Sequence, residues 1–252
     1  MADPLTALRA SVDRLAELVR PLGHDITRQA YPSAWSIAQV VSHVGSSAVI
    51  FERRLADGLA GRDTPPDFAE SLWAEWDHKS PDAQAADGLA ADEAFMRELE
   101  SLGPEERTKV SVSLGPVTFD WDQVVRARLS EHVVHEWDVA VALDPAATLA
   151  ADGVLHVVDN LDLIGRYTAQ PVAPERTITV ATTEPERSFT VTVEAQAVAF
   201  SSVTGVEEPT LTMPAEAFIR VVYGRLDPEH TPETVTGDVE ALAQLREIFP
   251  GM

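Results

Sequence analysis

The spacing of apolar residues changes once along the chain, and this change constrains the fold more than any other feature of the sequence. Up to about residue 168, apolar positions recur every three or four residues, the period of helices that bury one face. From residue 177 onward, TITVAT, FTVTVEA and TLTM alternate apolar with polar residues, as strands do. We therefore expect a mixed fold, with a helical domain over residues 1–148 followed by a small α+β domain over residues 149–252.

The first domain is expected to contain four long amphipathic helices that pack as a bundle. They are predicted over residues 4–21, 36–59, 83–102 and about 122–143, with a shorter helix at LWAEW. Ser36 is a suitable N-cap for the second of them, whose apolar stripe is Ile37, Val41, Val44, Ala48, Phe51 and Leu55. The stretch SVSLGPVTFDW is too broken for a long strand. In the second domain we expect a helix near 149–168 and two final helices, PAEAFIRVVYG and DVEALAQLREIF, with Pro214 in the first turn of the former and Gly224 at its end.

The run RLSEHVVHEWDVA in the fourth long helix is rich in side chains that bind metals. Residues four apart lie on one helix face, so Glu131 pairs with His135 and His132 pairs with Glu136. These two pairs point about 100° apart around the helix axis, and only one can face the bundle interior. Neither pair reproduces the HExxH or HxxEH pattern of metalloprotease helices. The residues alone leave the choice between the two pairs open.

A third ligand would complete a metal site, and His43 on the second helix is the best candidate because that helix belongs to the same bundle. Imidazole and carboxylate ligands without sulfur suit zinc, although nickel, iron and manganese also accept them. Three protein ligands with one open position are typical of catalytic zinc. The competing interpretation is that these are ordinary hydrogen-bonded helix residues. The remaining histidines receive no role: His24, His78, His156 and His230.

Composition excludes several classes of function. The net charge of −22 argues against nucleic acid as a partner, because polyanion binding depends on clustered Lys and Arg. No apolar run reaches the roughly 20 residues of a membrane span, and the N-terminus lacks a signal-peptide pattern, so we expect a cytoplasmic protein. Cysteine is absent, so any thiol chemistry must use a thiol from outside the chain. Whether the protein is a monomer or a homodimer stays open.

Two motifs together resemble the mycothiol-dependent maleylpyruvate isomerase family: PSAWSIAQVVSHV in the second helix and RLSEHVVHEWDVA in the fourth. The resemblance covers most of the chain and implies a DinB-like metal-binding four-helix bundle followed by a C-terminal domain akin to sterol-carrier folds. It also implies His43, Glu131 and His135 as the metal ligands. Arg225 is the implied catalytic arginine, with Arg220 as the less favoured choice. Asp138 would either orient a ligand or brace the helix.

The resemblance implies a divalent metal, preferably zinc, and mycothiol as the thiol cosubstrate. The thiolate would add to a small electrophile, either to isomerise the cis double bond of a maleylpyruvate-type acid or to form an S-conjugate. Two alternatives remain: a zinc hydrolase with a metal-bound water, and a non-catalytic protein that binds a small apolar ligand and holds a structural metal.

Overall fold

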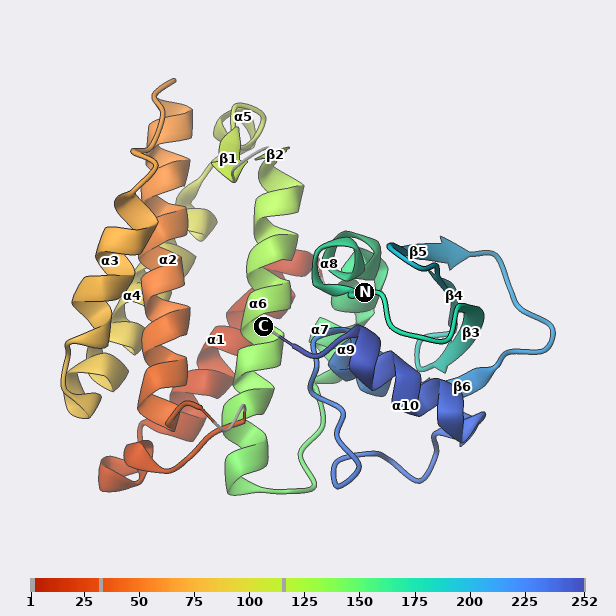
Figure 1. Ribbon diagram of the computed structural model, residues 1–252. Coiled ribbons are helices and arrows are strands. Elements are labelled where there is room, and N and C mark those ends of the chain that lie inside the picture. Colours follow the sequence, from red (N-terminus) through yellow and green to blue (C-terminus); the bar gives the residue numbers. More distant parts are fainter. Residues whose placement is uncertain (1–2, 32–33, 115–116, 252) are drawn as a thin grey trace. The chain divides into compact units, whose positions relative to one another are not determined.

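The structure, a computed structural model, describes residues 3–31, 34–114 and 117–251 (Figure 1). These residues form two compact units, the first ending at Ala147 and the second beginning at Thr148. The helices of the first unit are α1 (Pro4–Val19), the 3-10 turn η1 (Gly23–Thr27), α2 (Ile37–Leu59), α3 (Phe68–Asp77), α4 (Pro81–Ser101), α5 (Pro104–Arg107) and α6 (Trp121–Leu143). The mixed helix and strand class predicted from the change of period is confirmed.

Polar caps determine where the two histidine-bearing helices begin. The predicted N-cap Ser36 is confirmed: its hydroxyl accepts a bond from Gln39 N, and the Gln39 amide oxygen accepts one from Ser36 N. Asp120 and Gln123 form the same reciprocal pair at the start of α6. Such a capping box satisfies backbone donors that a helix end would otherwise leave unpaired. The two capping boxes therefore mark the residues at which α2 and α6 begin.

The four long helices of the first unit pack against one another (Figure 1): α2 lies against α4 and α6, and α1 lies against α6 and α4. The contact between α2 and α4 is especially close at two glycines. A Cβ on Gly45 would lie 2.4 Å from Gly88 Cα, and a Cβ on Gly88 would lie 2.5 Å from the Val41 carbonyl oxygen. Backbone therefore touches backbone two residues from His43.

The predicted apolar stripe of α2 is buried with one exception. Phe51 is only half-buried, and the other members are covered by neighbouring helices: Ile37, Val41, Val44, Ala48 and Leu55. Between α5 and α6 the chain forms an antiparallel hairpin of β1 (Val112–Leu114) and β2 (Val117–Phe119). No long strand forms there, in agreement with the sequence, but the hairpin itself was not predicted. Residues 32–33 and 115–116, which belong to the quoted motif and loop, lie outside the described residues.

The second unit is α+β. Its helices are α7 (Ala151–Val157), the 3-10 turn η2 (Val158–Asn160), α8 (Leu161–Thr168), α9 (Ala215–Val222) and α10 (Val239–Ile248). Its strands are β3 (Arg176–Thr183), β4 (Arg187–Val193), β5 (Val198–Val203), β6 (Leu211–Pro214) and β7 (Thr236–Gly237). The sheet has the order β5-β4-β3-β6-β7, in which only the β3–β6 pair of the described ladders is parallel. Phe189 and Phe200 of the sheet pack on Phe218 of α9.

Three predictions for the second unit need correction. The single helix expected near 149–168 is wrong, because η2 interrupts it: α7 and α8 both pack on α9, and α8 also packs on β5. Strand β5 was missed, since its residues after Phe200 are exposed and break the alternation. Pro214 ends β6 and is the N-cap of α9 rather than part of its first turn. Gly224 does follow α9, with a φ of +69°.

Candidate metal centre

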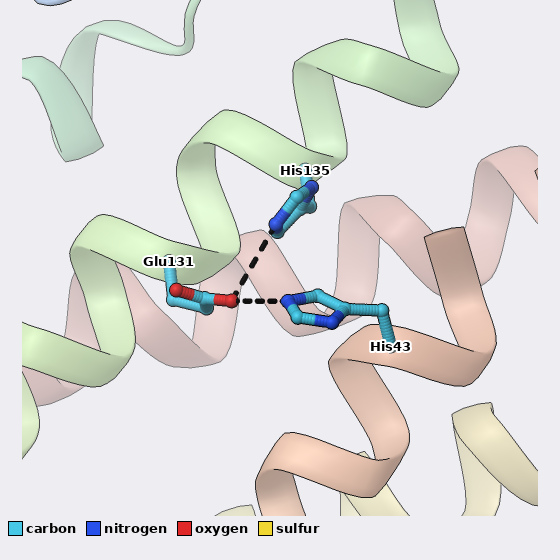
Figure 2. Close-up of side chains that lie close together, drawn as sticks. All are labelled: His43, Glu131 and His135. Carbon is cyan, nitrogen blue, oxygen red and sulfur yellow. Dashed lines mark hydrogen bonds and ion pairs between the residues drawn. The ribbon is translucent and has the colours of Figure 1, made fainter. Parts of the chain in front are cut away.

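Three predicted ligands, one from α2 and two from α6, converge inside the first unit (Figure 2). Glu131 Oε1 lies 2.6 Å from His43 Nε2 and 3.4 Å from His135 Nε2. One donor atom from each side chain lies within 4.8 Å of the others. Two imidazole nitrogens and one carboxylate oxygen form a donor set that suits zinc and related divalent ions. The donor set and its convergence therefore fit a three-ligand metal site.

The electrostatics of the cluster favour an ionised glutamate beside positive charge. Burial raises the pKa of Glu131, but hydrogen bonds and charge from His135 and His43 together hold that pKa well below its usual value. Burial also lowers the pKa of His135, whereas Asp138 and Glu131 raise it to about 9. The carboxylate thus gains from a cation at this position, and a divalent ion would supply one without a proton.

Asp138 orients His135. Its Oδ2 lies 2.8 Å from His135 Nδ1, and the side chain is completely buried. With Nδ1 donating to a carboxylate, His135 Nε2 is the nitrogen directed at Glu131, as in many metal-binding histidines. The preceding Trp137 packs edge-on against Tyr31 and donates from Nε1 to the Ala147 carbonyl. In this motif, therefore, Asp138 orients the imidazole ring of His135, and Trp137 contributes to the packing of the first unit.

Trp35 covers the two imidazoles. Its ring centroid lies 5.0 Å from that of His43 and 6.2 Å from that of His135. Beside His43 is a cavity of about 360 Å³ whose lining comes from Trp35 and from α2, α3 and α4. The sequence does not predict this cavity. For two of the residues that line it, Trp73 and Trp76, it predicts only a short helix.

The other pair on α6, His132 and Glu136, already forms hydrogen bonds with residues of α1 and α4. His132 Nδ1 lies 2.8 Å from Ser11 Oγ on α1, and His132 Nε2 lies 2.7 Å from Asp92 Oδ2 on α4. Glu136 accepts bonds from Ser11 and, at 2.8 Å, from Arg14 Nε. Both ring nitrogens of His132 are therefore occupied. This pair cross-links α1, α4 and α6 instead of offering lone pairs to an ion.

Arg128 extends this buried network toward the metal candidates. Its NH2 donates to Asp92 Oδ1 at 2.6 Å and to the Val44 carbonyl, next to His43, at 2.9 Å. Burial raises the pKa of Asp92, but His132 and Arg128 hold it far below its usual value. This network could not be predicted from local patterns, because the residues around Asp92 have the spacing and composition expected for a solvent-exposed helix position.

Arg225, the arginine implied by the resemblance, belongs to the second unit and follows α9. It is buried, and its NH1 donates to the Tyr223 carbonyl at 2.6 Å. Arg220 is buried as well and pairs with Glu216 on the same helix. The catalytic role of Arg225 stays a prediction. Of the histidines without a predicted role, His24 and His78 are exposed and His230 pairs with Asp227.

Comparison with known proteins covers nearly the whole chain. Residues 8–140 match the family model described as mycothiol maleylpyruvate isomerase N-terminal domain, and residues 148–244 match its C-terminal domain. Two crystal structures share the fold, those of mycothiol-dependent maleylpyruvate isomerase and of a histidine-to-alanine mutant of it. Each has a TM-score of 0.65 and 15% identity, covering 94% of this chain and 93% of that chain.

A search of curated proteins by sequence found no match. Among the described residues, no helix has both the length and the apolar character needed to cross a membrane. The two family models together span the chain from the bundle to the last helix, and on that basis the chain belongs to the mycothiol-dependent maleylpyruvate isomerase family.

Proposed function

We propose that this protein is a metal-dependent enzyme that uses mycothiol as its nucleophile, with His43, Glu131 and His135 as the ligands of a divalent ion, preferably zinc. The observation that carries the proposal is the convergence of the three donor atoms within 4.8 Å. Family membership supports mycothiol as the thiol, and the absence of cysteine from the chain agrees with a thiol supplied from outside.

A bound zinc ion would deprotonate a coordinated thiol outright at neutral pH, whereas a free thiol with a pKa of about 8.5 is mostly protonated. The chain's own residues prepare the place for that sulfur. Asp138 holds His135 in the tautomer that presents Nε2. Trp35 lies against the imidazole rings of His43 and His135 and limits the directions from which a ligand can reach them.

The proposed reaction is addition followed by elimination. The thiolate sulfur of mycothiol forms a bond to one carbon of the cis double bond, and the electron pair moves onto the conjugated carbonyl oxygen. The former double bond is now single and rotates. The electron pair then returns, the carbon–sulfur bond breaks, and the trans isomer and the thiolate are released. With an electrophile from which the sulfur does not leave again, the same addition followed by uptake of a proton from solvent at the neighbouring carbon gives an S-conjugate.

Acidic substrates need positive charge on a protein whose net charge is −22. Arg225 is our candidate for binding a substrate carboxylate, since a buried guanidinium binds such a group in a fixed, two-pronged geometry. Replacing Arg225 with Lys should raise KM for an acidic electrophile and leave the KM for mycothiol unchanged. An equal rise in both constants would contradict this role.

The test of the proposed function is metal analysis combined with turnover. Purified protein should contain about one divalent ion per chain and should convert maleylpyruvate, or conjugate an electrophile, only when mycothiol is present. Chelation should abolish turnover and zinc should restore it. Turnover without any thiol would instead indicate a hydrolase with a metal-bound water. A metal-free protein with full activity would contradict the proposal.

A further inference from the structure

The cavity beside His43 has a composition that points to a particular ligand chemistry. It lies within the first unit, and its volume of about 360 Å³ is near the lower end of the range for small-molecule pockets. His43 is part of its lining, whereas Glu131 and His135 are not. The cavity therefore adjoins the candidate metal centre at His43, and a molecule in it would lie beside that ligand.

Three of the five tryptophans of the chain line this cavity. Trp35 lies against His43, and Trp73 keeps 44% of its surface exposed, which is unusual for so large an apolar side chain. Trp76 is buried, and Lys79 Nζ lies 3.6 Å from the centre of its ring. Indole faces bind flat, weakly polar surfaces, such as the C–H faces of six-membered rings, as well as cations.

The polar part of the lining consists of hydroxyl and amide groups. Ser42 and Gln84 are each only 4% exposed, so their polar atoms are held in place by packing. Gln84 Nε2 lies 3.4 Å from the Trp76 carbonyl oxygen, and Gln39 contributes a second amide. Amides and hydroxyls both donate and accept hydrogen bonds. They match a ligand that presents many hydroxyl groups.

The charge of the lining favours a neutral ligand. Asp77 is the only carboxylate among the described lining residues, and neither Lys nor Arg belongs to the lining. A carboxylate or phosphate held between the tryptophans would face Asp77 with no lysine or arginine of the lining beside it, since the candidate metal lies only at the His43 end. The acidic electrophile of the proposed reaction is therefore a poor fit for this cavity, which suits the other reactant better.

We propose that this cavity is the subsite for the uncharged, hydroxyl-rich ring portion of the low-molecular-weight thiol, with the sulfur of that thiol directed toward His43. The inference rests on the proposed function, because it takes the thiol as the molecule that reaches the metal. Mycothiol fits the chemistry: its sulfur-bearing amino acid is attached to a glucosamine ring linked to inositol. The tryptophans contact the ring faces, while Ser42, Gln39 and Gln84 bind the hydroxyl groups.

The first experiment measures binding without any sulfur. N-acetylglucosaminyl-inositol, the neutral ring portion of mycothiol, is titrated into the purified protein, and into protein treated with a chelator, while tryptophan fluorescence and binding heat are followed. We expect saturable binding in both preparations, with a change in fluorescence. The same two-ring fragment carrying a phosphate ester, which keeps both rings and adds negative charge, should bind more weakly. No binding of the neutral fragment, or tighter binding of the phosphate, would overturn the proposal.

The second experiment compares Trp73→Ala with Trp121→Ala, a tryptophan outside the cavity whose ring packs against Arg107. Because Trp73 is half-exposed, its removal should leave thermal unfolding almost unchanged. Trp73→Ala should weaken fragment binding about tenfold and raise KM for mycothiol by a similar factor, without changing KM for the electrophile. Binding of cysteine, a thiol without rings, should not change. Trp121→Ala should alter none of these values.

An equal loss of affinity for cysteine and mycothiol in Trp73→Ala would overturn the subsite, as would wild-type fragment binding in that variant. These outcomes are separable from failure of the proposed function. If the protein bound no metal and turned over no thiol conjugate, fragment binding would still report on the cavity. Conversely, the protein could turn over mycothiol in a metal-dependent reaction and yet fail to bind the fragment. That result would support the proposed function and contradict the proposed subsite.

Discussion

Two faces of helix α6 each carry one histidine and one glutamate, but these side chains have different partners on the two faces. On one face Glu131 and His135 meet His43, and their donor atoms converge on a common point. On the other face His132 and Glu136 are bonded to Ser11, Asp92 and Arg14 from two other helices. The difference lies in the neighbours and not in the pair itself. A histidine and glutamate four residues apart are candidates for metal binding where a neighbouring helix adds another imidazole, as His43 does, and not where hydrogen-bond partners from other helices occupy both side chains.

The largest effect should come from removing a candidate ligand. His43→Ala leaves two donors, so metal affinity should fall by more than the roughly 10–100-fold expected for loss of a supporting residue. Thermal unfolding of the metal-free protein should change little, because His43 is partly exposed. Metal content by elemental analysis is the measurement, with the exposed His24→Ala as the control. Full metal content in His43→Ala would show that the ion binds at a site that does not include His43.

Breaking the other face should affect stability and not metal binding. Asp92→Ala would leave the buried Arg128 and His132 without their carboxylate, and removal of one partner from a buried ion pair costs about 3–5 kcal/mol. Denaturant unfolding measures this loss. Folded variant protein should still bind one metal ion. Loss of the metal from a fully folded Asp92→Ala protein would show that the two faces are not independent.

A smaller effect is expected for Asp138→Asn, which keeps the shape but removes the charge that faces His135 Nδ1. Metal affinity should fall about 10–100-fold, measured by competition with a chelator of known affinity. Unchanged affinity would reduce Asp138 to a structural role. A smaller loss of metal affinity in Asp138→Asn than in His43→Ala would indicate that Asp138 orients a ligand and does not bind the metal itself.

The smallest expected effect is a pH dependence of the unfolding free energy, caused by Asp92, which pairs with His132 and Arg128 of α6. The pKa of Asp92 is lower in the folded protein than the ordinary 3.8, so the folded state binds fewer protons on this group than the unfolded chain. Its contribution is therefore complete above about pH 5 and decreases as the pH falls through the unfolded-state pKa toward the lower folded-state pKa. The difference in unfolding free energy between wild type and Asp92→Asn should shrink between pH 5 and pH 3. A constant difference would contradict the assignment of the charge to Asp92.

Local patterns in the sequence predicted much of this arrangement. Ser36 was identifiable as an N-cap, and the helical spacing placed Glu131 with His135 and His132 with Glu136. Spacing alone did not decide between the pairs, because the decision depends on residues far away in the chain such as Asp92. The family resemblance selected His43, Glu131 and His135, and the structure brings these three together.

Other features depend on tertiary packing that no local pattern records. The break at Val158–Asn160 contains neither glycine nor proline, and it lies between two helices that both pack on α9, of which only α8 also packs closely on β5. Strand β5 is held by its ladder with β4 although its own alternation fails after Phe200. The tryptophan cavity likewise joins segments of α2, α3 and α4 whose separate patterns resemble ordinary helices.

The backbone contact between Gly45 and Gly88 limits how the cavity beside His43 can be altered. Because α2 and α4 already touch there, the spacing of these two helices cannot contract, and even one added methyl group would force them apart. Any such expansion would also displace His43, two positions away on the same helix. A redesign that admits a bulkier guest molecule should therefore keep this pair of glycines and vary α3, where Trp73 can be shortened without moving a ligand.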